Sequence, residues 1–315
     1  MKKALIIKLG YSETLEDGIS QDVSFGDVLR TTFILHFFKD YHVSWLADKK
    51  ALPLLVNNPY INNILLWNSG DVKKIKGRYF DIVVNFEKLK DIYILIDSLK
   101  IDNFFGFSLA TLYDKQRHSL GSRKLFKLSE SIEDRRKNKF CWQKILAEII
   151  NKKWKGEKYI LGYKPRSNEQ YDIGFNWTVS KRWTNKAWPK GYWNKLEDLI
   201  KGKYSVSWQQ GHNNLYEYME WINSCRLIVT ADTLGLHLAL ALKKKAIGLF
   251  GPTSPREIFF YNSSGYLLPD FSCNCMPCFM PNCKRGKPCI EYIFPEKVKN
   301  KIDEEITQNT NSLKV

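Results

Sequence analysis

Short apolar runs alternate with longer segments of helical periodicity along most of the chain. Residues 4–10, with the sequence ALIIKLG, form a compact apolar run closed by glycine, which is typical of a buried strand. Apolar positions recur at helical spacing over residues 28–38. The same pattern predicts strands at 42–47, 64–67, 80–86 and 103–107 and helices around 51–56 and 91–99. This alternation favours a parallel sheet covered by helices on both faces.

A polar, basic stretch over residues 113–139 interrupts the alternation, and a helix predicted at 140–150 follows it. Strands are then predicted at 171–175, 204–208, 226–230 and 246–250, with helices at 192–200, 215–223 and 234–242 and a last helix from Pro295. We therefore predict an α/β protein of two doubly wound, Rossmann-like domains, residues 1–160 and 161–315, facing each other across a cleft. Ligands of such sheets bind outside the carboxyl ends of the strands.

The charge of the chain points to an anionic partner. Lys and Arg number 49 against 33 Asp and Glu, which gives a net charge of +16 and a pI near 9.4. Nucleic acid, an anionic membrane surface or a phosphorylated substrate would suit this excess, although a lysine-rich genome would produce it as well. Lys8 interrupts the first apolar run too early for a secretion signal, and no run of about 18 apolar residues occurs. We expect a cytoplasmic protein.

One candidate site lies between the strand predicted at 226–230 and the helix that follows it. Asp232 and Thr233 fall at the turn, and His237 lies about one helical turn into the helix. The free amides and positive dipole end of a helix start bind phosphate. The alternative is that Asp232 and Thr233 only cap the helix and that His237 packs in the core.

Two further loops carry candidate chemistry. The strand predicted at 171–175 runs into a polar loop with Lys186, whose flexible ammonium could reach a diphosphate; the alternative is an ordinary exposed loop. Near the amino terminus, Gly26 permits close approach of the backbone to a ligand, and Asp27 stands at a helix start. The alternative there is that Ser24 caps the helix and Asp27 complements its dipole.

Together these segments resemble glycosyltransferase family 9, the heptosyltransferase family. Gly26-Asp27 matches the family's Gly-Asp, residues 186–189 match its Lys-x-Trp-Pro, and residues 232–253 match its Asp-Ser/Thr-Gly-x-x-His followed by Phe-Gly-Pro-Thr. The resemblance implies a GT-B fold with the acceptor bound by the amino-terminal domain and the nucleotide sugar by the carboxyl-terminal one. It implies a catalytic base, Asp27; an acceptor-side or helix-start loop with Gly26 and Arg30; and donor-binding residues, namely Lys186, Asp232, Thr233, Gly235 and His237.

The implied activity is inverting glycosyl transfer without a cofactor. The donor would be ADP-heptose and the acceptor the lipopolysaccharide core or another anionic, lipid-linked cell-envelope glycan, reached by peripheral contact with the inner face of the inner membrane. The alternatives are another nucleotide sugar, or a protein or polysaccharide acceptor. A nucleic-acid-binding protein with a thiolate metal site is less favoured because no such binding signature accompanies the charge. A dehydrogenase is rejected because Gly10 is not part of a Gly-x-Gly-x-x-Gly motif.

The chain departs from the family pattern at two places. Residues 11–24 insert a loop between the first strand and Gly26, which would rim the acceptor site. Leu234 stands where the family has glycine, and Gly235 follows one position later, so the donor contacts are expected to shift.

Five of the seven cysteines lie in the segment 273–289. Cys275 and Cys278 have the spacing of a metal-binding knuckle, and Cys283 and Cys289 would complete four thiolates around a structural Zn or Fe. Many members of the family carry a similar segment, and some bind iron there. The alternative is a set of reduced, unliganded thiols.

Overall fold

The computed structural model describes residues 1–11, 23–108, 120–210, 214–261, 264–271 and 273–312. The chain divides into two compact units, Met1–Lys164 (unit 1) and Pro165–Val315 (unit 2). Most of the insertion at 11–24 lies outside the described residues. No helix in the described part of the chain is long and apolar enough to cross a membrane.

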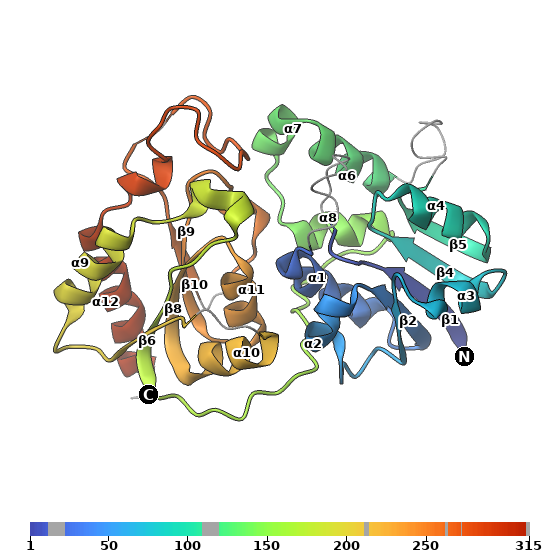
Figure 1. Cartoon of the computed structure of the whole chain (residues 1–315), viewed down its shortest axis with the longest axis horizontal. Helices are drawn as coiled ribbons and strands as arrows, with labels where there is room; N and C mark the ends of the chain where they lie inside the picture. The colour runs from blue at the N-terminus through green and yellow to red at the C-terminus, as the bar shows by residue number, and fades with distance from the viewer. Residues whose placement is uncertain (12–22, 109–119, 211–213, 262–263, 272, 313–315) are drawn as a thin grey trace. The chain divides into compact units, whose positions relative to one another are not determined.

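Unit 1 is built on a sheet of five parallel strands in the order β3-β2-β1-β4-β5 (Figure 1). The strands are β1 (Lys2–Ile7), β2 (Tyr41–Ala47), β3 (Asn63–Leu66), β4 (Tyr79–Asn85) and β5 (Lys100–Gly106). The central strand β1 is apolar from Ala4 to Ile7, and all four of these residues are fully buried because helices cover the sheet. Gly10 follows its carboxyl end, and the Gly10 carbonyl accepts a hydrogen bond from the Ser24 amide.

The helices of unit 1 differ from the sequence prediction in two ways. The periodic segment 28–38 forms an α-helix, α1 (Phe25–Thr31), that continues as a 3-10 helix, η1 (Thr32–Phe37), instead of one regular helix. The stretch 113–139, predicted to lack the pattern, contains α6 (Leu120–Glu130) and α7 (Ile132–Lys137). Helix α7 forms because Ser131 caps its amino end by accepting a hydrogen bond from the Asp134 amide at 3.1 Å. The other elements are η2 (Lys49–Ala51), α2 (Leu52–Leu55), α3 (Gly70–Ile75), α4 (Lys90–Asp97) and α8 (Trp142–Ile149).

Unit 2 contains a second sheet of five parallel strands, in the order β10-β9-β8-β6-β7. Its strands are β6 (Tyr171–Asn176), β7 (Val206–Trp208), β8 (Cys225–Ala231), β9 (Lys245–Leu249) and β10 (Ser264–Leu267). Helices α9 (Lys190–Ile200) and α12 (Pro295–Ser312) pack together, and α10 (Leu215–Ser224) packs on α11 (Leu234–Ala241) (Figure 1). Short 3-10 helices complete the unit: η3 (Lys181–Lys186), η4 (Pro255–Glu257) and η5 (Cys289–Tyr292). The prediction of two doubly wound, Rossmann-like sheets is confirmed.

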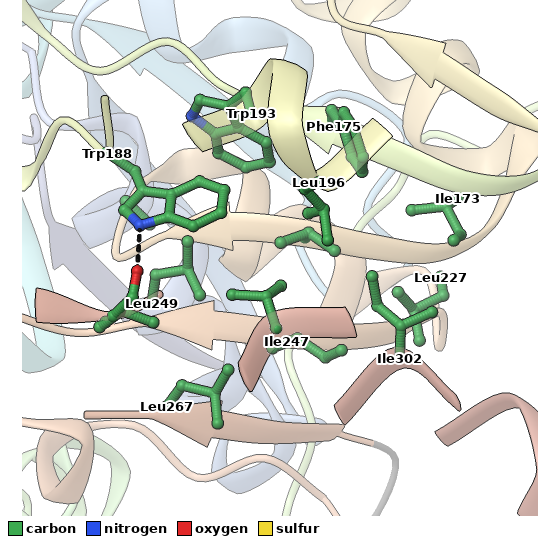
Figure 2. Close-up of a cluster of buried hydrophobic side chains, with 14 of the residues drawn as sticks. Ile173, Phe175, Trp188, Trp193, Leu196, Leu227, Ile247, Leu249, Leu267 and Ile302 are labelled. Atoms are coloured by element: carbon green, nitrogen blue, oxygen red, sulfur yellow. Dashed lines mark hydrogen bonds between the residues drawn. The ribbon is translucent and has the colours of Figure 1, made fainter. Parts of the chain in front are cut away.

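A tryptophan-rich core anchors the loop that carries the candidate lysine. Figure 2 shows Trp193 beside Phe175 of β6 and Trp188 over Leu249 of β9. The two indoles meet edge to face with their centroids 4.8 Å apart, and the Trp188 Nε1–H donates a hydrogen bond to the Ile293 carbonyl at 2.8 Å. The Trp-Pro of residues 186–189 therefore belongs to the core, and it fixes the position of Lys186 two residues earlier.

Candidate functional site

The turn between β8 and α11 is held by a buried hydrogen-bond network. Thr233 is the amino-terminal cap of α11, where its hydroxyl accepts from the Gly235 amide at 3.3 Å. The side-chain amide of Asn176, at the carboxyl end of β6, donates to the hydroxyls of Thr230 at 2.7 Å and Thr233 at 3.0 Å. The Tyr218 hydroxyl donates to the Asn176 carbonyl at 2.8 Å. Both the nitrogen and the oxygen of the Asn176 side-chain amide thus have hydrogen-bond partners, and this side chain links β6, β8 and α11.

Gly235 makes room for this network. A Cβ atom at Gly235 would lie 2.2 Å from Nδ2 of Asn176 and 2.5 Å from the hydroxyl of Tyr218. The glycine one position later than the family pattern is thus required by packing against Asn176. Sequence reasoning did not assign Asn176 or Tyr218, because nothing in their local pattern shows that they converge on one helix start.

Lys186 and Asp232 form an ion pair at the same turn. The Lys186 ammonium lies 2.9 Å from Oδ2 of Asp232 and donates to its backbone carbonyl, also at 2.9 Å. The Lys186 side chain is 13% exposed and that of Asp232 17% exposed, so Lys186 is not the ordinary exposed loop residue of the alternative interpretation. Lys186 is the last residue of η3. Its ammonium lies 4.8 Å from the centroid of the Trp183 ring in the same 3-10 helix.

The charge of Asp232 is fixed by its neighbours. Burial by itself would raise the pKa of this carboxyl, but the positive charges of Lys186 and His237 and the Lys186 hydrogen bond lower it to about 2. His237 is buried on α11, as expected one turn into the helix. At neutral pH the turn therefore presents a permanent anion, a bound ammonium and the free amides of a helix start.

Asp27 lies at the equivalent place in unit 1, after the carboxyl end of β1. The Ser24 amide donates to the Gly10 carbonyl at 2.6 Å, and the Asp27 amide donates to the Ser24 carbonyl at 3.1 Å. Gly10 has φ +91°, and a Cβ there would lie 2.6 Å from a methyl of Val28. The Ser24 side chain makes no capping hydrogen bond. Asp27 instead pairs with Arg30, whose Nη2 lies 2.9 Å from its Oδ1.

A buried carboxylate supports the end of β1. Glu87 accepts hydrogen bonds from the amides of Leu9 at 2.8 Å and Gly10 at 2.9 Å, and it lies 3.1 Å from the Lys8 ammonium. Burial raises the pKa of Glu87, opposed by the charge of Lys8. Sequence reasoning missed this pair, because a Lys and a Glu that lie far apart in the sequence carry no local signal.

The cysteine-rich segment gathers its thiols around one small cavity. Five cysteines line it: Cys273, Cys275, Cys278, Cys283 and Cys289. The sulfur atoms of Cys273 and Cys275 are 2.9 Å apart. Among the residues described, no three His, Cys, Asp or Glu side chains are arranged to hold a metal ion as they stand.

The same cavity adjoins the lysine segment. Asn185, which precedes Lys186, lines the cavity, and its amide nitrogen lies 3.8 Å from the Cys278 sulfur and 3.2 Å from the Met280 carbonyl. Its side chain is buried, and its Oδ1 has no hydrogen-bond partner in the described structure. Soft thiolates beside an unpartnered buried oxygen fit a metal such as Zn or Fe by donor chemistry.

The predicted site residues therefore fall into three groups. The turn of unit 2 brings together the predicted donor residues: Lys186, Asp232, Thr233, Gly235 and His237. Unit 1 holds Gly26, Asp27 and Arg30 on α1. The four predicted metal ligands share the thiol cavity of unit 2.

Part of unit 2 is similar in sequence to known glycosyltransferases. Residues 210–288 match the model of glycosyltransferase family 9 (heptosyltransferase). A lipooligosaccharide heptosyltransferase 2 of Campylobacter jejuni subsp. jejuni serotype O:2 is 31% identical over 75 residues, which is 24% of this chain and 24% of that protein. This alignment thus spans about a quarter of the relative's length.

Solved structures are similar over nearly the whole chain. A family 9 glycosyltransferase from Veillonella parvula has a TM-score of 0.68 at 16% identity and covers 98% of both chains. Escherichia coli heptosyltransferase WaaC with ADP-2-deoxy-2-fluoro heptose has a TM-score of 0.62 at 15% identity, covering 96% of this chain and 99% of that one. The iron-containing dodecameric heptosyltransferase TibC has a TM-score of 0.60 at 12% identity, covering 98% and 77%.

The fold is that of the GT-B glycosyltransferases, with one Rossmann-like sheet in each unit. The resemblance to glycosyltransferase family 9 is confirmed, and the segment 210–288, which contains the turn at Asp232, carries the family match.

Proposed function

We propose that the protein transfers a sugar from a nucleoside diphosphate to a hydroxyl of a cell-envelope glycan, with inversion at the anomeric carbon. The observation that carries this proposal is the Lys186 ammonium held against Asp232 at the first turn of α11. An ammonium beside free helix-start amides suits a diphosphate. ADP-heptose is the proposed donor, because WaaC, a structural relative, was solved with an ADP-heptose analogue.

The leaving diphosphate acquires negative charge as its bond to the sugar breaks. Lys186 and the free amides that precede Gly235 at the start of α11 stabilise that charge, and the network around Asn176 holds them in place before the reaction. The paired Asp232 keeps the ammonium at the turn, while the diphosphate accepts from the remaining N–H of Lys186.

Asp27 is the proposed base on the acceptor side. Its carboxylate takes the proton from the acceptor hydroxyl while that oxygen attacks the anomeric carbon on the face opposite the diphosphate. In this proposal unit 1 binds the acceptor and unit 2 binds the donor. The net charge of +16 suits an anionic, lipid-linked acceptor such as a lipopolysaccharide core, reached from the cytoplasm at the inner membrane.

Nucleotide release from a panel of sugars tests this proposal. We expect ADP release from ADP-heptose that increases when a heptose-deficient lipopolysaccharide core is added, with UDP-glucose as the matched control donor. If nucleotide is released only from another nucleotide sugar, that sugar nucleotide and not ADP-heptose is the donor. If a protein or a polysaccharide stimulates release and the lipopolysaccharide core does not, that molecule is the acceptor. No release from any donor would refute the transferase proposal.

The thiol cavity is proposed to hold a structural Zn or Fe through Cys275, Cys278, Cys283 and Cys289. A bound metal would cross-link the segment on which Asn185 and η3 rest, so it supports the donor turn without taking part in the reaction. Protein purified under reducing, metal-replete conditions should contain about one metal ion per chain. Cys278→Ser should lose the metal and lower the melting temperature, whereas Cys141→Ser, away from the cavity, should retain it. Protein that contains no metal and is nevertheless fully stable would refute this proposal.

A further inference from the structure

The guanidinium of Arg30 contacts both the Asp27 carboxylate and a buried indole. Its Nη2 is 2.9 Å from Oδ1 of Asp27, and its Cζ lies 4.4 Å from the centroid of the Trp142 ring. The Arg30 side chain is 12% exposed and Trp142 is 2% exposed. A guanidinium stacked on an indole and bound to a carboxylate has little freedom to choose another rotamer.

The indole belongs to a different part of unit 1. Trp142 is the first residue of α8, which packs against α1 and is buried along its apolar face. Arg135 of α7 also lies over this ring, with its Cζ 5.6 Å from the centroid. A ring from a helix distant in sequence thus lies against the guanidinium of Arg30.

An ordinary charge pair on a helix needs no such support. Pairs three residues apart on an exposed helix surface contribute only about 0.2–0.5 kcal/mol and vary in geometry. The pair on α1 is mostly buried and is backed by an aromatic ring from another helix. Its burial and its geometry therefore indicate a role in orienting the carboxylate.

We infer that Arg30, fixed by the Trp142 indole, is a positioning residue that holds one carboxylate oxygen of Asp27 and keeps that side chain aimed at the acceptor hydroxyl. This inference rests on the proposed role of Asp27 as base. Trp142 then acts indirectly in the same function, because it orients Arg30, which in turn orients Asp27.

The test compares the pH dependence of kcat/KM in four variants with that of the parent. Arg30→Gln removes the charge, Arg30→Lys keeps the charge and loses the planar guanidinium, and Trp142→Phe shrinks the platform. Arg135→Gln is the matched control, because it changes the other guanidinium over the same ring. The charged residues on the helices packed against α1, His36 on η1 and Lys144 and Glu148 on α8, are unchanged in all of them, and α2 carries none.

We expect Arg30→Gln to lower kcat about 10- to 100-fold and to move the acid limb of kcat/KM upward by about one pH unit or more, because a carboxylate that loses an adjacent cation is protonated more readily. Arg30→Lys should keep the limb near its parent position but lower kcat, and Trp142→Phe should lower kcat less. Arg135→Gln should match the parent in both.

Three results would overturn the inference. One is an unchanged kcat and acid limb in Arg30→Gln and Trp142→Phe. Another is a higher acceptor KM with unchanged kcat, which would make Arg30 an acceptor ligand. The third is equal loss in Arg135→Gln, which would show a general packing effect. A parent that transfers no sugar would refute the proposed function itself, whereas an active parent with unaffected variants would refute only the role of Arg30.

Discussion

The two sheets carry similar turns that are built in different ways. In each unit an aspartate follows the carboxyl end of a buried parallel strand and pairs with a cation at 2.9 Å. Asp27 pairs with Arg30 on its own helix, whereas Asp232 pairs with Lys186 from η3, a different element. The Lys186 ammonium also holds the Asp232 carbonyl, so that pair joins two segments of the backbone.

Because of this difference, we expect one aspartate to matter mainly for the reaction and the other mainly for the stability of the fold. Removing the charge of Asp27 disturbs the pair with Arg30 on the same helix and the proposed contact with the acceptor. Removing the charge of Asp232 loosens the attachment of η3 to the start of α11. The first change should therefore affect turnover most, and the second should affect stability most.

The largest expected effect is on turnover in Asp27→Asn. Asparagine is nearly isosteric but cannot accept the proton, so turnover should fall roughly 100- to 10,000-fold. The melting temperature should fall less than in Asp232→Asn, because asparagine suits a helix start and its carbonyl can still accept a hydrogen bond from Arg30, although the charge of the pair and a dipole interaction of under about 1 kcal/mol are lost. Turnover near that of the parent would show that Asp27 only stabilises α1.

The next effect is a loss of stability in Asp232→Asn. The ammonium of Lys186 would lose its charged partner in a mostly buried setting, which should lower the free energy of unfolding by about 1.5–3 kcal/mol. Asp198→Asn, an exposed site on α9, is the control and should lie within about 0.5 kcal/mol of the parent. Equal stability of the two variants at neutral pH would contradict the structural role of the ion pair.

A packing test of the same turn is Gly235→Ala. The added methyl would overlap the Asn176 amide, so the free energy of unfolding should fall by about 1–3 kcal/mol and donor affinity should fall with it. The double variant Gly235→Ala with Asn176→Ala relieves the overlap and should destabilise less than the sum of the two single changes. Strict additivity of the single effects would show that the two residues do not oppose each other.

The smallest expected effect is in the pH dependence of stability. The folded-state pKa of Asp232, about 2, lies below its ordinary value of 3.8, so its contribution is fully present above about pH 4 and is lost as the pH falls toward 2. The full shift corresponds to about 2–3 kcal/mol, of which about half is lost by pH 3. Denaturant unfolding of the parent and Asp232→Asn between pH 7 and pH 3 should therefore show a gap that narrows with acidity. If the difference in free energy of unfolding between the two proteins does not change with pH, the lowered pKa of Asp232 does not contribute to stability.

The strands could be predicted from the sequence because buried parallel strands are continuous apolar runs, as in β1 and β8. Strand β10 was missed because its four residues, SGYL, lie at the edge of the sheet and show little pattern. Helices α6 and α7 were missed because their basic composition obscures the apolar positions of α6 and the Ser131 cap of α7.

Only those site residues that lie close together in the sequence could be predicted as a group. Asp232, Thr233 and His237 are close in sequence, so one turn places all three. The burial of Lys186 depends on Asp232, and the need for Gly235 depends on Asn176 and Tyr218. These contacts join segments that the tertiary fold alone brings together.

The central claim is that donor binding resides at the unit 2 turn and proton transfer at Asp27. Calorimetric titration of ADP into the parent, Asp27→Asn, Lys186→Met and the loop control Lys181→Met tests it most directly. We predict measurable ADP binding to the parent, unchanged affinity in Asp27→Asn and Lys181→Met, and an affinity about 10- to 100-fold weaker in Lys186→Met, since a hydrogen bond to a charged group is worth about 1.5–3 kcal/mol. No ADP binding to the parent at millimolar concentration, or unchanged affinity in Lys186→Met, would contradict it.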